Sequence, residues 1–187
     1  SGAIALGCIK MKYNKLGQTD LVVSELCLGT MTWGTQNTAY DAFYQIEKSM
    51  DAGINFIDTA ELYPVNPISG ATQGESERIL GNWLNKSNSR DKLIIATKIA
   101  GNGPKHIRNG EGINKKSLFT AIEASLKSLK TDYIDLYQLH WPNRGSYHFR
   151  QNWRFDPTNQ DKSKVLGHIN EVLEACEVLK KAGKVWK

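Results

Sequence analysis

Four side chains capable of catalytic chemistry occur at regular places in the sequence. Asp58, Lys98 and His140 each end a short run of apolar or β-branched residues, and Tyr63 follows Asp58 by five positions. Runs of this kind are typical of buried strands. Taken singly, each residue has an ordinary interpretation, as a turn aspartate, a loop tyrosine, a surface lysine or a core histidine. At the carboxyl ends of neighbouring parallel strands, however, they would form one reactive cluster.

This set of groups suits the reduction of a carbonyl compound. Hydride transfer leaves negative charge on the carbonyl oxygen, which must then be hydrogen-bonded and protonated. A phenol ordinarily titrates at about pH 10, and an adjacent ammonium favours its ionised form. We expect Lys98 to act in this way on Tyr63, with Asp58 balancing the buried ammonium. His140 would donate a second hydrogen bond and orient the carbonyl group.

The elements that would position these residues repeat along the chain. Two short segments flank a four-residue turn, which predicts a β-hairpin, and short apolar runs then alternate with stretches of helical periodicity. The hairpin covers 12–16 and 21–25; the expected strands are 26–30, 55–58, 92–98 and 133–140; the expected helices are 41–52, 75–84, 114 or 115 to 129, and 169–181. Val185 and Trp186 would begin a further strand.

Apolar strands that alternate with helices predict an α/β fold of right-handed β/α units around a parallel sheet. The chain holds a hairpin and four such units, whereas a complete (β/α)8 TIM barrel takes about 250 residues. We therefore expect residues 11–187 to be the N-terminal half of one barrel domain. Residues 1–10 would be a tag or extension, because Met11 resembles a natural start. Two alternatives stay open: a half-barrel that pairs with a partner or its own copy, and a flavodoxin-like doubly wound sheet, which leaves the hairpin unexplained.

The composition narrows the class of protein. The 187 residues are 40% hydrophobic and carry a net charge of +5, but the basic residues are spread among 19 acidic ones, so we expect no nucleic-acid partner. No apolar stretch is long enough to span a membrane. Cys8, Cys27 and Cys176 form no C-x-x-C motif or metal-ligand spacing, which favours reduced thiols, no metal and a cytoplasmic location.

Two long loops would lie at the same end of the barrel as the reactive side chains. Residues 100–114 are rich in glycine and polar side chains, and the aromatic residues Tyr147, Phe149, Trp153 and Phe155 lie within 141–167. Loops of this length are often lids or binding segments. The aromatic side chains favour an aromatic or apolar carbonyl compound as the small-molecule partner.

The motifs around these residues resemble those of the aldo-keto reductases. Residues 53–63 resemble the first signature of that family, residues 132–142 resemble the second, and 95–98 look like its lysine-bearing strand. The hairpin and residues 28–31 look like the family's barrel-bottom plug and first strand. Further similarity, in 61–67 and 81–84, is to the bacterial Tas-like branch, which itself resembles potassium-channel β subunits.

The resemblance implies a fold, an activity and a site. It implies a TIM barrel of aldo-keto reductase type and NADPH-dependent reduction of aldehydes or ketones, with Asp58, Tyr63, Lys98 and His140 as the catalytic tetrad and Tyr63 as the proton donor. It places Gly29, Thr30 and Met31 near the nicotinamide and its ribose, which Asp58 would also touch. Trp33 and Trp141 would wall the substrate pocket, although core packing explains either tryptophan equally well.

Part of the family's pattern lies beyond these four units. The Ser-Asn pair that holds the carboxamide and the residues that grip the 2′-phosphate follow the fifth strand in the family, and no G-x-G-x-x-G motif opens a βαβ unit here. Two other functions therefore stay open: a regulatory subunit that senses nicotinamide, with slow or no catalysis, and a half-barrel that is inactive alone. A homo-oligomer is compatible with every one of these hypotheses.

Overall fold

The computed structural model describes residues 10–143 and 153–187. Cys8 and nearly all of the segment predicted to be a tag or extension lie outside these ranges. The described chain begins with an antiparallel hairpin of β1 (Tyr13–Lys15) and β2 (Val22–Ser24). The Asn55 side chain joins the hairpin to the chain entering β4: its Oδ1 accepts from Ser24 N at 2.8 Å, and its Nδ2 donates to Val22 O at 3.0 Å. The hairpin therefore covers the amino-terminal end of the sheet, as predicted.

Four parallel strands follow in the order β3-β4-β5-β6, which is their order in the sequence. They are β3 (Leu28–Gly29), β4 (Phe56–Asp58), β5 (Ile94–Ile99) and β6 (Leu136–Leu139). The helices are α1 (Ala39–Asp51), α2 (Glu75–Ser87), α3 (Lys115–Leu129) and α4 (Lys162–Lys181). Three short 3-10 helices lie at Arg90–Lys92, Arg108–Gly110 and Pro157–Asn159.

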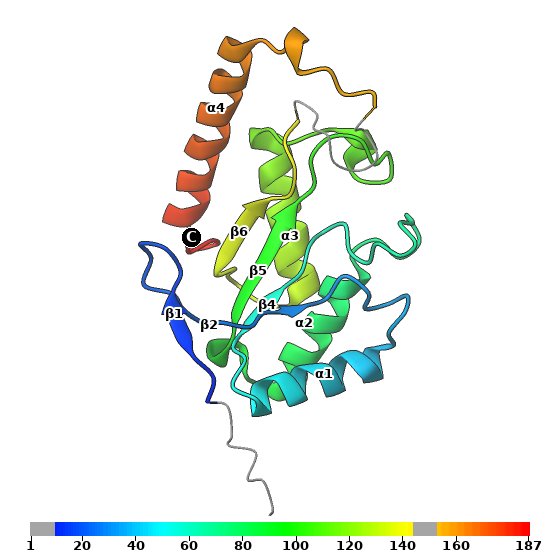
Figure 1. The fold of residues 1–187 in the computed structure, drawn as a ribbon, viewed down its shortest axis with the longest axis vertical. Coiled ribbons are helices and arrows are strands. Elements are labelled where there is room, and N and C mark those ends of the chain that lie inside the picture. The colour runs from blue at the N-terminus through cyan, green and yellow to red at the C-terminus, as the bar shows by residue number, and fades with distance from the viewer. Residues whose placement is uncertain (1–9, 144–152) are drawn as a thin grey trace, which may run out of the picture.

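The topology is that of a partial (β/α)8 barrel. Successive helices pack on one another, α1 on α2, α2 on α3 and α3 on α4, and they follow one another along the sheet in Figure 1. A doubly wound sheet would reverse its strand order and divide its helices between two faces, so that alternative is excluded. The predicted fold class is confirmed. Val185 forms a parallel bridge to Ile134, which confirms that a fifth strand begins there.

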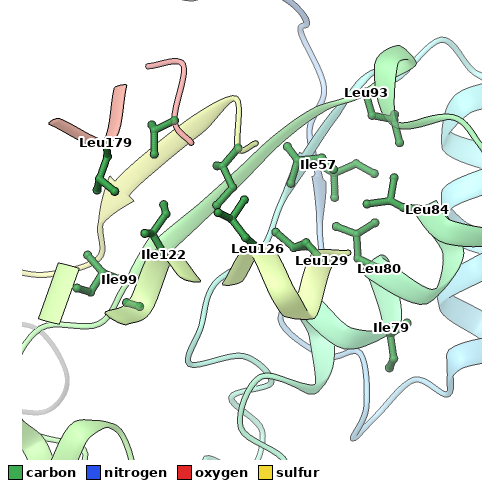
Figure 2. Packing of buried hydrophobic residues seen from close by; sticks show 14 of the residues in the cluster. Ile57, Ile79, Leu80, Leu84, Leu93, Ile99, Ile122, Leu126, Leu129 and Leu179 are labelled. Atoms are coloured by element: carbon green, nitrogen blue, oxygen red, sulfur yellow. The ribbon is translucent and has the colours of Figure 1, made fainter. Parts of the chain in front are cut away.

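The core lies between the strands and the helices. Ile57, Ile95 and Ile99 point from the strands to the helix side, where they meet apolar side chains of α2, α3 and α4, part of which Figure 2 shows. Gly81 lets α2 approach α3 closely, because a Cβ there would lie 2.1 Å from the backbone oxygen of Ser128. This packing fixes the strands and thereby the directions of the side chains at their ends.

Two predicted elements differ from the structure. Strand 26–30 was expected to be buried, yet only Leu28 and Gly29 pair, and Gly29 is exposed, because the strand lies at an edge and has a neighbour on one side only. Helix α4 begins at Lys162 rather than 169. The Asp161 carboxylate accepts hydrogen bonds from the backbone of Ser163 and Lys164 and so caps the helix at that point. The loop after β6 is correspondingly shorter than expected.

Candidate active site

The residues at the carboxyl ends of the strands come together because of the strand register. In the parallel ladder Asp58 of β4 is paired with Ala96 of β5, and Lys98 of β5 is paired with Gln138 of β6. Since side chains alternate along a strand, the side chains of Asp58, Lys98 and Gln138 emerge on the same face, away from the helices. Three adjacent strands thus deliver a carboxylate, an ammonium and an amide to one place.

Lys98 is the centre of this cluster. Its Nζ donates to Asp58 Oδ2 at 2.6 Å, to the backbone oxygen of Thr59 at 2.7 Å and to Tyr63 Oη at 3.3 Å. All three protons of the ammonium are therefore directed at acceptors. The Lys98 side chain is 12% exposed and that of Asp58 is 28% exposed, so solvent screens the ion pair only partly. The geometry brings a phenol into contact with a buried positive charge.

His140 follows β6 and completes the group. Its ring lies edge-on to that of Tyr63, with 5.7 Å between the centroids. Burial, reinforced by the charge of Lys98 and opposed by Asp58, lowers the pKa of His140 to about 4. The imidazole is therefore neutral at physiological pH, and its buried Nδ1 has no partner among the described residues. A neutral ring can donate one hydrogen bond to a ligand without adding a charge.

A second ion pair fixes the loop that carries Tyr63. Glu61 accepts a hydrogen bond from the backbone N–H of Ala100, and Arg108 bridges the Glu61 carboxylate, at 2.5 Å, and the Ala100 oxygen, at 2.9 Å. Glu61 lies two residues before Tyr63, and Ala100 lies two residues after Lys98. The clamp therefore joins the chain segments that bear these two reactive groups, and both of its charged side chains are nearly buried.

The residues predicted to lie near a nicotinamide are not equally accessible. Gly29 lies directly across from Asp58 and is exposed, and a Cβ at Gly29 would meet nothing within 4 Å. Met31 is 42% exposed. This open surface beside Asp58 fits a flat ring bound against the end of β3. Thr30 is fully buried, and its hydroxyl has no hydrogen-bond partner in the described part of the chain, so its side chain does not face that surface.

The two tryptophans predicted to wall the substrate pocket lie in different environments. Trp33 is 0% exposed, belongs to the core, and donates its indole N–H to Gln45 at 2.7 Å. The expectation that Trp33 walls the substrate pocket is thus corrected, and the packing interpretation holds. Trp141 lies beside His140, with ring centroids 4.9 Å apart, and donates to the backbone oxygen of Asn102 at 3.0 Å. Trp141 is therefore at the rim, where a pocket residue must be.

Gln138 is a member of the cluster that sequence reasoning missed. Its Nε2 donates to Asp58 Oδ1 at 3.1 Å, so it occupies the carboxylate oxygen that Lys98 leaves open. Alternation along the strand contained the signal, because a residue two positions before His140 shares its face. An uncharged amide in an apolar run carries no local sign of a catalytic role, unlike the carboxylate, ammonium and imidazole at the strand ends.

The loops at this rim are described in part. The loop after β5 packs Ile107 and Ala100 with Leu62 from the Tyr63 loop, and Trp141 lies against this small apolar cluster. Of the four aromatic residues predicted to favour an aromatic carbonyl compound, Tyr147 and Phe149 lie outside the described residues. Trp153 is 96% exposed.

Within residues 10–143 and 153–187, no group of three or more His, Cys, Asp or Glu is placed to hold a metal. In the same ranges no helix is both long and apolar enough to cross a membrane.

The fold and the site together define a class of protein. The family model described as the Aldo/keto reductase family matches residues 25–187, and the chain belongs to this family. The resemblance seen in the sequence motifs is thereby confirmed.

Individual relatives and a solved structure support membership of the same family. The chain is 41% identical to Protein tas of Escherichia coli strain K12 over 181 residues, covering 94% of this chain and 50% of that protein. It is 37% identical to norsolorinic acid reductase stcV of Emericella nidulans, covering 87% and 38%. Among solved structures it is similar to the holo form of aldo-keto reductase AKR11C1 from Bacillus halodurans, with a TM-score of 0.66, 33% identity, and coverage of 94% and 48%. The chain thus spans about half the length of the relatives it matches.

Proposed function

We propose that the natural polypeptide containing this chain reduces aldehydes or ketones with NADPH, and that Tyr63 is the proton donor. The observation that carries the proposal is the contact of Lys98 Nζ with Tyr63 Oη at 3.3 Å, backed by the Asp58 carboxylate. An ammonium in contact with a phenol stabilises the charge that remains after the phenol has given up its proton. A phenol on a solvent-exposed loop would lack this stabilisation.

Each member of the group has a task in the reaction. Tyr63 would donate its proton to the carbonyl oxygen while Lys98 stabilises the phenolate that results. Asp58 would balance the positive charge of the ammonium and hold the ammonium in contact with the phenol. His140, neutral because its pKa is lowered to about 4, would hydrogen-bond the same carbonyl oxygen and orient it. A nicotinamide bound against Gly29 and Met31 would supply the hydride.

The coenzyme and the substrate class follow from the family and from the charge of the chain. NADPH is proposed from the family resemblance, and the net positive charge of +5 is compatible with an anionic coenzyme. One relative has a name that describes a reductase of norsolorinic acid, which supports a reductive reaction for this chain as well. A cytoplasmic location and a homo-oligomer stay predictions.

The test is consumption of NADPH, and separately of NADH, by the natural polypeptide at its full length. The assay offers it a panel of aliphatic and aromatic aldehydes and ketones. We expect carbonyl-dependent oxidation of the coenzyme and formation of the alcohol in equal amounts. Tight binding of the coenzyme with no turnover of any carbonyl would contradict the proposal and favour the regulatory subunit. Because the pKa of His140 is lowered to about 4, His140 itself should cause no limb in the rate between pH 5 and pH 7.

A further inference from the structure

The Asp58 carboxylate is divided between two donors. One oxygen, Oδ2, accepts from Lys98 at 2.6 Å, and the other, Oδ1, accepts from Gln138 Nε2 at 3.1 Å. We infer that Gln138 is a positioning residue of the catalytic group. Its amide holds the Asp58 carboxylate in the plane that directs one oxygen at Lys98, and its N–H disperses part of the negative charge of the carboxylate. The inference rests on the proposed function of Tyr63 and extends it to a residue that does not touch the substrate.

The strand register makes the amide's position rigid. Lys98 and Gln138 are directly paired in the β5–β6 ladder, and β5 and β6 are held by the core behind them. The amide therefore reaches across the face of β5 to the end of β4 from a fixed backbone position. Without this donor, Asp58 could rotate about its side-chain bonds, because its Oδ1 would have no other protein partner among the described residues.

The charge on Asp58 matters to Tyr63 through Lys98. A carboxylate that is bound only by the ammonium attracts it more strongly and exerts its full negative field on the nearby phenol. An amide N–H that donates to the carboxylate disperses part of that charge. Removing the donor should therefore make the Tyr63 proton harder to lose and weaken Tyr63 as an acid. The predicted effect is on proton transfer, with substrate binding left almost unchanged.

Other ionisable groups around the phenol have to be considered in any pH measurement. They are Lys98 on β5, Asp58 at the end of β4, His140 after β6, and the Cys27 thiol just before β3. The pKa of His140 is lowered to about 4, and that of Cys27 is raised to about 11 by burial and by Asp58. Neither group changes charge between pH 5 and pH 9. Glu77, in the core behind β5, does change charge in this range, because burial raises its pKa to about 7. The ultraviolet titration of the phenol therefore identifies which part of a limb belongs to Tyr63.

The experiment compares Gln138→Leu and Gln138→Glu with the wild type in the full-length natural polypeptide. Leucine is similar in volume but has no donor, and glutamate replaces the donor by a second negative charge when it is ionised. Leu136→Met is the matched control, because Leu136 lies two positions earlier on the same strand and has no polar group. The readouts are the pH profile of kcat/KM for carbonyl reduction and an ultraviolet titration of the Tyr63 phenol, defined by subtraction of the Tyr63→Phe variant.

We expect the alkaline limb and the phenol titration of Gln138→Leu to move upward by roughly half a pH unit, and those of Gln138→Glu to move further. In Gln138→Leu, kcat should fall about 3- to 10-fold while KM for the carbonyl stays within about twofold, and the control should behave as the wild type. An unchanged profile and titration in Gln138→Leu, with a loss of stability alone, would reduce Gln138 to a packing residue. If the wild type reduces no carbonyl compound, the proposed function fails, but the phenol titration still decides the role of Gln138.

Discussion

Two cation–carboxylate pairs lie at opposite ends of the parallel sheet. At the amino end, Arg90 binds Asp135 at 2.6 Å, and its guanidinium also donates to the backbone oxygens of Leu93 and Tyr133. At the carboxyl end, Lys98 binds Asp58 at the same distance. Both pairs have a cation that is mostly buried and is shared with main-chain oxygens.

The two ion pairs differ in what the cation contacts besides its carboxylate and the main-chain oxygens. Arg90 packs over the ring of Tyr133, 3.9 Å from its centre, and its contacts are to main-chain or carboxylate oxygens and to the Thr131 hydroxyl. Lys98 instead contacts the hydroxyl of Tyr63, an acid that can exchange its proton with a ligand. Burial and pairing of a charge therefore stabilise both strand ends, and both cations lie over a tyrosine ring. Catalytic potential arises only where the cation contacts the ionisable hydroxyl itself, as Lys98 does.

Lys98→Met should produce the largest effect on kcat among the variants that test this difference. Methionine keeps much of the length of lysine but removes the charge next to the phenol. We expect kcat for carbonyl reduction to fall by about three orders of magnitude, the range found for loss of a well-placed electrostatic group. The free energy of unfolding should change by less than about 2 kcal/mol, because Asp58 is partly exposed and solvent can hydrate it. A variant with near-normal turnover would contradict the role given to the ammonium.

Arg90→Met should give the opposite result. The Asp135 side chain is 5% exposed, so removal of its partner leaves a buried charge without a counterion. We expect a loss of about 3 kcal/mol in the free energy of unfolding, measured by urea denaturation. The kcat of the molecules that stay folded should lie within about twofold of the wild type. A strong fall in kcat without loss of stability would contradict a structural role for Arg90 at the amino end of the sheet.

Glu77→Gln should have a smaller and stabilising effect. Glu77 lies in the core behind β5 and accepts a hydrogen bond from Thr97 at 2.6 Å, and burial raises its pKa to about 7. The folded protein therefore holds the proton more tightly than the unfolded chain, and the stability from this group is lost as the pH rises from about 4.5 through 7. At pH 8 glutamine should stabilise the fold by about 2 kcal/mol, whereas at pH 4.5 it should change little.

The control for that variant is Glu47→Gln, at an exposed glutamate of α1. It should leave the pH dependence of unfolding as it is in the wild type. Equal behaviour of the two variants between pH 5 and pH 8 would show that Glu77 is ionised in the folded protein at every pH tested.

The sequence was sufficient for the fold and for most of the site. Strand ends and apolar alternation located Asp58 and Lys98 because the strand register depends on the buried face, which the pattern records. The bounds of α3 followed from the regular apolar spacing, and the structure shows that the Asn114 side chain caps its start. A local pattern could not decide whether Trp33 lines the core or a pocket, since both environments favour a large aromatic side chain.

Other features depended on contacts between distant parts of the chain. The start of α4 was placed late because Gly167, a residue of low helix propensity, interrupts the apolar pattern, whereas the Asp161 cap starts the helix at Lys162. The Glu61–Arg108 clamp joins residues 47 positions apart, and the Gln138–Asp58 bond joins residues 80 apart. Neither pairing has a local signature, because each arises from the arrangement of strands and loops around the barrel end.

The central claim is that the Tyr63 phenol, activated by Lys98, protonates the substrate. Its most direct test is Tyr63→Phe in the full-length natural polypeptide, with turnover and NADPH affinity measured on the same preparation. We expect carbonyl reduction to fall by at least about 100-fold, the usual contribution of a general acid, while the Kd for NADPH stays within about twofold. Normal reduction by the phenylalanine variant would contradict it.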